Sequence, residues 1–167
     1  MDARTGAWID QENARLAEII RRHGWFIQYV GGGTCSRPGC ECGPDDGPPF
    51  AYTIGLHGLA HPELLIFGVS MATAGGVLND LGDRIRNGAS LVPGVMISFE
   101  EWQHRIVPEV VPNPEEILLG SNSFYRLGRG RSVEALQLTV DDKNGLFPWD
   151  NGCLAPEMQP RPGTFKA

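Results

Sequence analysis

The sequence predicts an α+β fold, in which a mostly antiparallel sheet of about five to six strands carries two main helices packed on one face. Three observations lead to this prediction. Short apolar segments of strand composition follow one another in pairs, as the strands of antiparallel hairpins do. Two longer segments carry apolar residues at helical spacing instead. The chain has 167 residues, of which 41% are hydrophobic, and this suits a single domain with its own core.

Two main helices are predicted from apolar residues at helical spacing and from the residues that end each helix. The first is expected at residues 10–23, with Asp10 as its N-cap and Gly24 as the residue that ends it. Its apolar stripe consists of Leu16, Ile19 and Ile20. The second is expected at residues 70–87 and ends at Gly88. Its core face carries apolar side chains at helical spacing, namely Met71, Ala74, Val77, Leu78, Leu81 and Ile85.

The strand segments share aromatic and β-branched residues and are bounded by glycine, proline or polar residues. They are residues 25–30, 50–56, 63–68, 94–102, 104–112 and 133–140. Pro108 has no N–H to donate, so it favours an edge position for the strand that contains it. A short helix should start after Asn113, with Pro114 at its first position. The Asn144-Gly145 pair predicts a tight turn.

Two segments lack any periodic pattern. Residues 31–49 are rich in glycine and proline, and loops of this length inside a domain are usually functional or disordered. Residues 151–167 contain three prolines, and we expect them to form an irregular strap. The core should therefore be built from residues 10–150.

Charge and hydropathy restrict the classes of partner. The net charge of −6 and the isoelectric point of about 5.1 argue against nucleic-acid binding, which rests on basic surfaces. We expect no membrane partner, because no apolar run approaches the length of a transmembrane helix. The amino-terminal residues lack the pattern of a signal peptide, so a cytoplasmic location is expected. Arginine far outnumbers lysine, which is typical of proteins from GC-rich bacterial or phage genomes.

The cysteines form a candidate zinc site. Cys35, Cys40 and Cys42 lie within one loop, and Cys153 lies in the strap. Zinc in structural sites takes four tetrahedral ligands that are often thiolates, and a loop of glycine and proline can wrap one. The fourth ligand could be Cys153 or a histidine (His57, His61 or His104). Free thiols and a disulfide formed during purification are the alternatives.

A candidate ligand-binding cleft surrounds the connection between the strands at 50–56 and 63–68. We expect four residues to line it, namely Tyr52, His57, Trp149 and Asp150. Two histidines lie in this connection between two apolar strands, which makes it the expected rim of a site. The phrase "FPWD" adds an aromatic side chain and a carboxylate after a proline, a combination that often lines a pocket.

Acid–base chemistry would need a histidine close to a carboxylate. The candidate catalytic residues are His57 and His104, each paired with Glu63 or Asp150, because imidazole exchanges protons near neutral pH. Asp141 and Asp142 are interpreted as turn residues that bond their own backbone. The sequence contains neither the nucleophile elbow of the hydrolases nor a phosphate-binding loop of the Walker type.

Three segments together resemble a bacterial family known as domain of unknown function 4262. They are "HGWFIQYV", the stretch from "FAYTIGL" through "HPELLIFG" to "DRIRNG", and "LQLTVDDKNGLFPWD". This resemblance implies no activity, since none is established for that family. The pattern of a T-x-G strand followed by "EL" is also similar to the suppressor-of-fused superfamily, which supplies protein-binding and toxin-immunity modules.

Two functions from different classes follow from these observations. The first is a binding module that recognises a protein or a small ligand, with a zinc ion in the cysteine-rich loop as a structural element. The alternative is a small hydrolase or transferase that uses histidine and carboxylate groups near Tyr52, His57 and Asp150. The two functions differ in whether these groups converge in one pocket.

Overall fold

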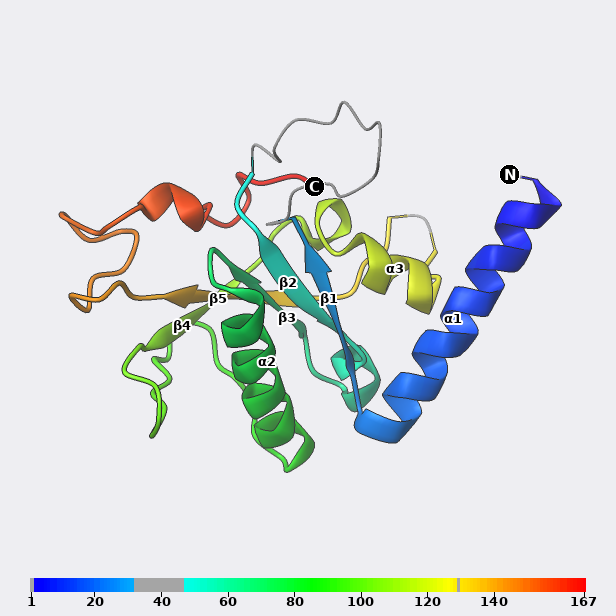
Figure 1. Ribbon diagram of the computed structural model, residues 1–167, viewed down its shortest axis with the longest axis horizontal. Helices are drawn as coiled ribbons and strands as arrows, with labels where there is room; N and C mark the ends of the chain where they lie inside the picture. The colour runs from blue at the N-terminus through cyan, green and yellow to red at the C-terminus, as the bar shows by residue number, and fades with distance from the viewer. Residues whose placement is uncertain (1, 32–46, 129) are drawn as a thin grey trace.

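The computed structural model describes residues 2–31, 47–128 and 130–167 and shows an α+β fold (Figure 1). In these residues, five strands form one sheet in the order β1-β2-β3-β5-β4. The strands are β1 (Phe26–Val30), β2 (Phe50–Ile54), β3 (Glu63–Phe67), β4 (Ile106–Val110) and β5 (Ala135–Val140). The α-helices are α1 (Ala3–His23), α2 (Met71–Arg86) and α3 (Leu119–Tyr125). The sheet is mostly antiparallel as predicted, but β3 and β5 run parallel.

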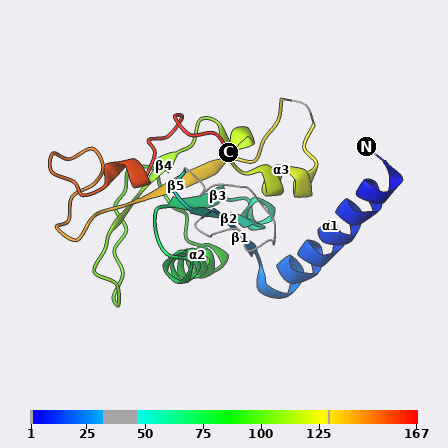
Figure 2. The same cartoon turned by 45° about the horizontal axis from the view of Figure 1, so that its top comes forward.

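The helices cover both faces of the sheet, so the prediction of two helices on one face is wrong. α2 packs on one face, against alternate residues of the central strands such as Leu64 and Ile66. On the opposite face, Leu65 and Phe67 belong to a cluster against which α3 packs Phe124 and Tyr125, and α1 packs Leu16 and Ile20. Figure 2 shows α2 and α3 on opposite sides of the sheet. The physical reason is that β2, β3 and β5 are buried at every position, and a strand of that kind needs cover on both sides.

The first helix starts earlier than predicted. Its N-cap is Asp2 rather than Asp10, and the Asp2 carboxylate accepts a hydrogen bond of 2.7 Å from the backbone N–H of Thr5. Asp10 instead pairs with Arg126 at the end of α3, at 2.6 Å. Gly24 ends the helix as predicted, with a φ of 97° that favours glycine.

Residues 94–102 do not form the strand that was predicted for them. Ile97 makes a single bridge with Ile106, and the chain then leaves the direction of β4. The reason is that Phe99 and Trp102 turn toward the core under α2 and pack edge to face on each other, with ring centroids 5.4 Å apart. β4 therefore lies at an edge of the sheet, as Pro108 predicted.

Two irregular segments complete the fold. Leu56–Leu59 form a short 3-10 helix between β2 and β3. The strap after β5 has one 3-10 turn, Pro156–Met158, and is held to β5 by Gln159, whose side-chain amide exchanges two hydrogen bonds of 2.8 Å with the backbone of Val140. In the part of the chain that the structure describes, no helix is long and apolar enough to cross a membrane.

Candidate functional site

One end of the sheet brings several elements together, because β3 and β5 run parallel. Both strands finish at this end, α2 begins there directly after β3, and antiparallel β4 starts there. A hollow of about 330 Å³ opens at this end of the sheet; we call it the His104 pocket. Its polar lining includes Ser70, Thr73, His104, Asp141, Asp142 and Gln159. Crevices at the carboxyl ends of parallel strands are common ligand sites.

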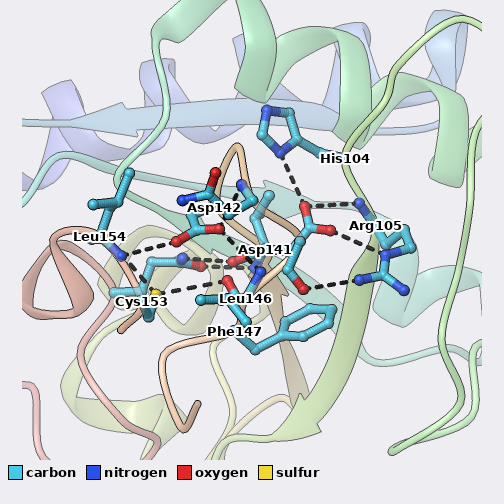
Figure 3. Close-up of polar contacts among 12 residues, drawn as sticks. His104, Arg105, Asp141, Asp142, Leu146, Phe147, Cys153 and Leu154 are labelled. Atoms are coloured by element: carbon cyan, nitrogen blue, oxygen red, sulfur yellow. Dashed lines mark hydrogen bonds and ion pairs between the residues drawn. The ribbon is translucent and has the colours of Figure 1, made fainter. Parts of the chain in front are cut away.

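His104 is held in the wall of this pocket by a buried carboxylate. Its Nδ1 donates to Asp141 Oδ1 at 2.9 Å, while only 3% of the Asp141 side chain is exposed (Figure 3). Arg105 donates to the same carboxylate twice, from its backbone N at 3.1 Å and its Nε at 3.0 Å. Because the carboxylate fixes the proton on Nδ1, Nε2 is the imidazole atom that can exchange a proton or accept a hydrogen bond. Among the described residues, Nε2 has no hydrogen-bond partner.

Trp102 separates the His104 pocket from a larger hollow. Its ring lies 5.0 Å from that of His104, centroid to centroid. On its other side is a groove of about 740 Å³, which we call the α2 groove. Residues 98–102 line one side of it, and Thr73, Gly76, Val77, Asp80 and Arg84 of α2 line the other. Thr73 and Trp102 belong to both linings, so the two hollows adjoin.

Asp142 and Cys153 fix the loop that closes the pocket. Asp142 accepts backbone hydrogen bonds from Asn144, Leu146 and Leu154, which hold the pKa of its carboxyl below the ordinary range. Figure 3 shows Cys153 beside this carboxylate. Burial, and then the charges of Asp142 and Asp150, raise the pKa of the Cys153 thiol, so it is a poor nucleophile.

Glu63, a predicted catalytic candidate, is fully buried and lies at the other end of β3. Its carboxylate accepts from the Thr53 hydroxyl at 2.6 Å and from the three backbone N–H groups of residues 55–57 at 2.9, 3.2 and 3.1 Å. It thereby caps the first turn of the 3-10 helix. Burial raises the pKa of Glu63, and these hydrogen bonds lower it by a smaller amount.

The four residues predicted to share a cleft lie apart. Tyr52 is buried, and its hydroxyl accepts from Gly120 N at 2.9 Å. His57 is exposed in the 3-10 helix, with its ring against that of Tyr125. Tyr52 pairs with Leu65 in the middle of β3, and His57 lies near the amino end of that strand, whereas the other two follow β5. Of the latter, Trp149 stacks on Phe147 beside edge strand β4, and Asp150 accepts from Phe147 N at 2.9 Å within a turn.

The described residues contain no group of three or more histidine, cysteine or acidic side chains that could hold a metal ion. Cys35, Cys40 and Cys42 lie outside the described residues, so the predicted zinc site stays a prediction. His61, a possible fourth ligand, uses both ring nitrogens within the fold. Its Nδ1 lies 2.8 Å from Pro62 O, and its Nε2 accepts from Leu91 N at 3.1 Å.

Sequence reasoning missed the carboxylate that orients His104. Asp141 was interpreted as a turn residue, and that interpretation is correct only for its neighbour Asp142. A signal was present, because His104 and Arg105 begin one predicted strand, residues 104–112, and Asp141 follows another, residues 133–140. If those strands pair in antiparallel fashion, these residues meet.

Comparison with known proteins gives one match. The family model described as "Domain of unknown function (DUF4262)" matches residues 19–154, which include all five strands, α2 and α3. No curated protein and no solved structure matches the chain. Because the match covers most of the sequence, the chain belongs to the family Domain of unknown function (DUF4262).

Proposed function

We propose that this protein is a binding module whose ligand is a small molecule held in the His104 pocket. The observation that carries the proposal is the His104–Asp141 pair, in which a buried carboxylate orients an imidazole whose other nitrogen is unused within the described part of the chain. Fixing a side chain in one orientation before binding reduces the entropy that binding must overcome.

The size and chemistry of the pocket support a small ligand. Its volume of about 330 Å³ lies at the lower end of the range for small-molecule sites. Its lining combines apolar groups, such as Phe67 and Met158, with a few polar ones that can set orientation, such as Thr73 and His104. Such a pocket holds a small organic molecule better than a flat protein surface would.

Acid–base catalysis is the second candidate function, and the same pair supports it. A carboxylate behind Nδ1 is the arrangement that lets Nε2 act as a general base. No serine, threonine or cysteine of the described residues hydrogen-bonds to His104, so water would be the nucleophile of a hydrolysis. The partner carboxylate would be Asp141 instead of the predicted Glu63 or Asp150.

Ligand-observed NMR with a library of small amines, carboxylates, amides and heteroaromatic fragments tests the binding function. The wild type is compared with His104→Ala and with His57→Ala, a histidine variant at the other end of the sheet. His104→Ala should fold, because Arg105 still satisfies Asp141. Fragments that bind the wild type and His57→Ala should bind His104→Ala about tenfold more weakly, which matches the loss of one good hydrogen bond. Equal binding to all three proteins, or no binding at all, would refute the proposal.

A further inference from the structure

The α2 groove carries more negative than positive charge. Its lining contains three carboxylates, those of Asp80, Glu100 and Glu101, and one basic group, that of Arg84. Asp80 and Arg84 neutralise each other in an ion pair of 3.0 Å on the surface of α2. Glu100 and Glu101 are exposed and form no ion pair or side-chain hydrogen bond with any other described residue. Two carboxylates of the groove are therefore available to a cation.

The aromatic side chains of the groove suit a planar cation. Arg84 already places its guanidinium over the ring of Phe99, 5.0 Å from the centroid. Trp102, on the same segment, packs its ring edge to face against Phe99 and is only partly buried. A tryptophan ring beside two carboxylates attracts a guanidinium or ammonium group both through its π face and through the charges.

Gly76 leaves the backbone of α2 open toward the groove. Glycine in the middle of a helix lowers helix stability relative to alanine. Two other glycines of α2 have a packing reason inside the fold. An added Cβ would lie 2.6 Å from the Tyr29 hydroxyl at Gly75 and 2.6 Å from the Trp25 ring at Gly82. At Gly76, which faces the groove, an added Cβ would meet nothing within 4 Å.

We infer that the α2 groove binds the guanidinium or ammonium group of a small organic cation, which lies against Gly76 and Trp102 and is neutralised by Glu100 and Glu101. The inference rests on the small-molecule binding proposed above and names the class of ligand. Because the groove adjoins the His104 pocket at Thr73 and Trp102, the rest of such a ligand extends toward His104.

Isothermal titration calorimetry with two nearly isosteric probes tests the inference. N-acetyl-L-argininamide carries the cation, and N-acetyl-L-citrullinamide replaces it with a neutral urea group. The charged probe should bind at least about tenfold more tightly than the neutral one, and its affinity should fall as salt is added. Equal affinity for the two probes, or no binding of either, would overturn the inference.

Two variants with matched controls locate the binding. Gly76→Ala should weaken the charged probe by about tenfold or more, because the new methyl group occupies the contact surface. The same variant should melt at the wild-type temperature or above it, since alanine favours a helix. Gly6→Ala is its control, because Gly6 is also a helical glycine with open space around it, in α1. An unchanged affinity in Gly76→Ala contradicts the inference.

The charge variant is Glu100→Gln with Glu101→Gln. It should weaken the charged probe by about tenfold at low salt. Glu115→Gln with Glu134→Gln changes the net charge equally at exposed positions away from the groove and should bind as the wild type does. If both double variants lose affinity equally, the attraction comes from the overall charge and the inference fails.

The results separate this inference from the proposed function. Fragment binding that depends on His104, without binding of the charged probe, would support the pocket and refute the cation site. Probe binding that depends on Gly76 and the two glutamates, with fragments indifferent to His104, would support the cation site and refute the pocket.

Discussion

The buried carboxylate of Glu63 gives the sharpest prediction about stability. In Glu63→Gln, an amide NH2 replaces one oxygen. The least costly orientation turns this NH2 toward Thr53, whose hydroxyl oxygen can accept from it, and away from the N–H groups of Gly55 and His57. The N–H of Leu56 then faces another donor, and the Thr53 hydroxyl, which already accepts from Leu64 N, loses the acceptor of its own proton. Two buried donors are then unsatisfied, and at about 1–3 kcal/mol for each we expect the free energy of unfolding to fall by about 2–6 kcal/mol.

Urea denaturation followed by tryptophan fluorescence measures this loss. Glu134→Gln is the control, because Glu134 is exposed next to β5 and the change should cost less than about 0.5 kcal/mol. Glu63→Ala leaves four donors without an acceptor, and at about 1–3 kcal/mol for each we expect no stable fold. A Glu63→Gln protein as stable as the wild type would refute the role assigned to the carboxylate.

The same variant has a predicted pH dependence. Because burial raises the pKa of Glu63, the folded protein holds a proton that the unfolded chain has already released at pH values just above the ordinary glutamate pKa. The contribution of Glu63 to stability therefore falls as pH rises through this window. Glutamine does not titrate, so the difference in stability between wild type and variant should narrow with rising pH. A difference that widens would contradict the raised pKa.

Three further predictions concern other parts of the chain. Gly55→Ala should cost more than about 2 kcal/mol, because φ is 137° and the new Cβ would lie 2.6 Å from a backbone oxygen; Gly88→Ala, with φ of 101° and open space, should cost less in the same urea assay. Burial, and secondarily the charge of Glu63, raise the pKa of Tyr125 to about 12, so an alkaline absorbance titration should lose its latest step in Tyr125→Phe. Native mass spectrometry of protein purified without chelator should show bound zinc that is lost in Cys40→Ser, whereas a metal-free wild type with free thiols would contradict the zinc prediction.

The elements that the sequence predicted well are those whose signals are local. The helix at 70–87 was predicted almost to the residue, since Ser70 caps it and its apolar side chains keep helical spacing. The strands at 50–56 and 63–68 could be predicted because a short connection joins two continuous apolar runs, and the structure confirms that they pair in antiparallel fashion. The parallel pairing of β3 with β5 joins residues about 70 positions apart, and no local pattern encodes such a contact.

The site was harder to predict because its two central residues flank different strands, His104 before β4 and Asp141 after β5. His104 was a catalytic candidate, but its partner Asp141 lies 37 residues away. Their meeting depends on the register of β4 and β5, in which Ile106 pairs with Val140 and Asp141 N donates to Arg105 O at 3.1 Å. A shift of one residue would turn the side chain of Asp141 to the other face, so the pair could be found only once the register was known.

The structure gives different roles to the polar groups of two motifs, "YTIGL...HPEL" and "FPWD", and to His104 and Gly76 in the two hollows. In "YTIGL...HPEL", the polar groups satisfy one another: Thr53 bonds Glu63, and His61 uses both ring nitrogens within the fold. In "FPWD", Asp150 caps its own turn. None of these groups is free for a ligand, so their substitution should lower stability.

The residues of the two hollows differ from these groups. Among the described residues, His104 has a nitrogen without a hydrogen-bond partner, and Gly76 has open space beside it. Substitution of either residue should change binding and leave stability nearly intact. Measuring both quantities on one set of variants therefore separates the support of the fold from its site, and a variant of His104 that unfolds as Glu63→Ala does would show that this separation is wrong.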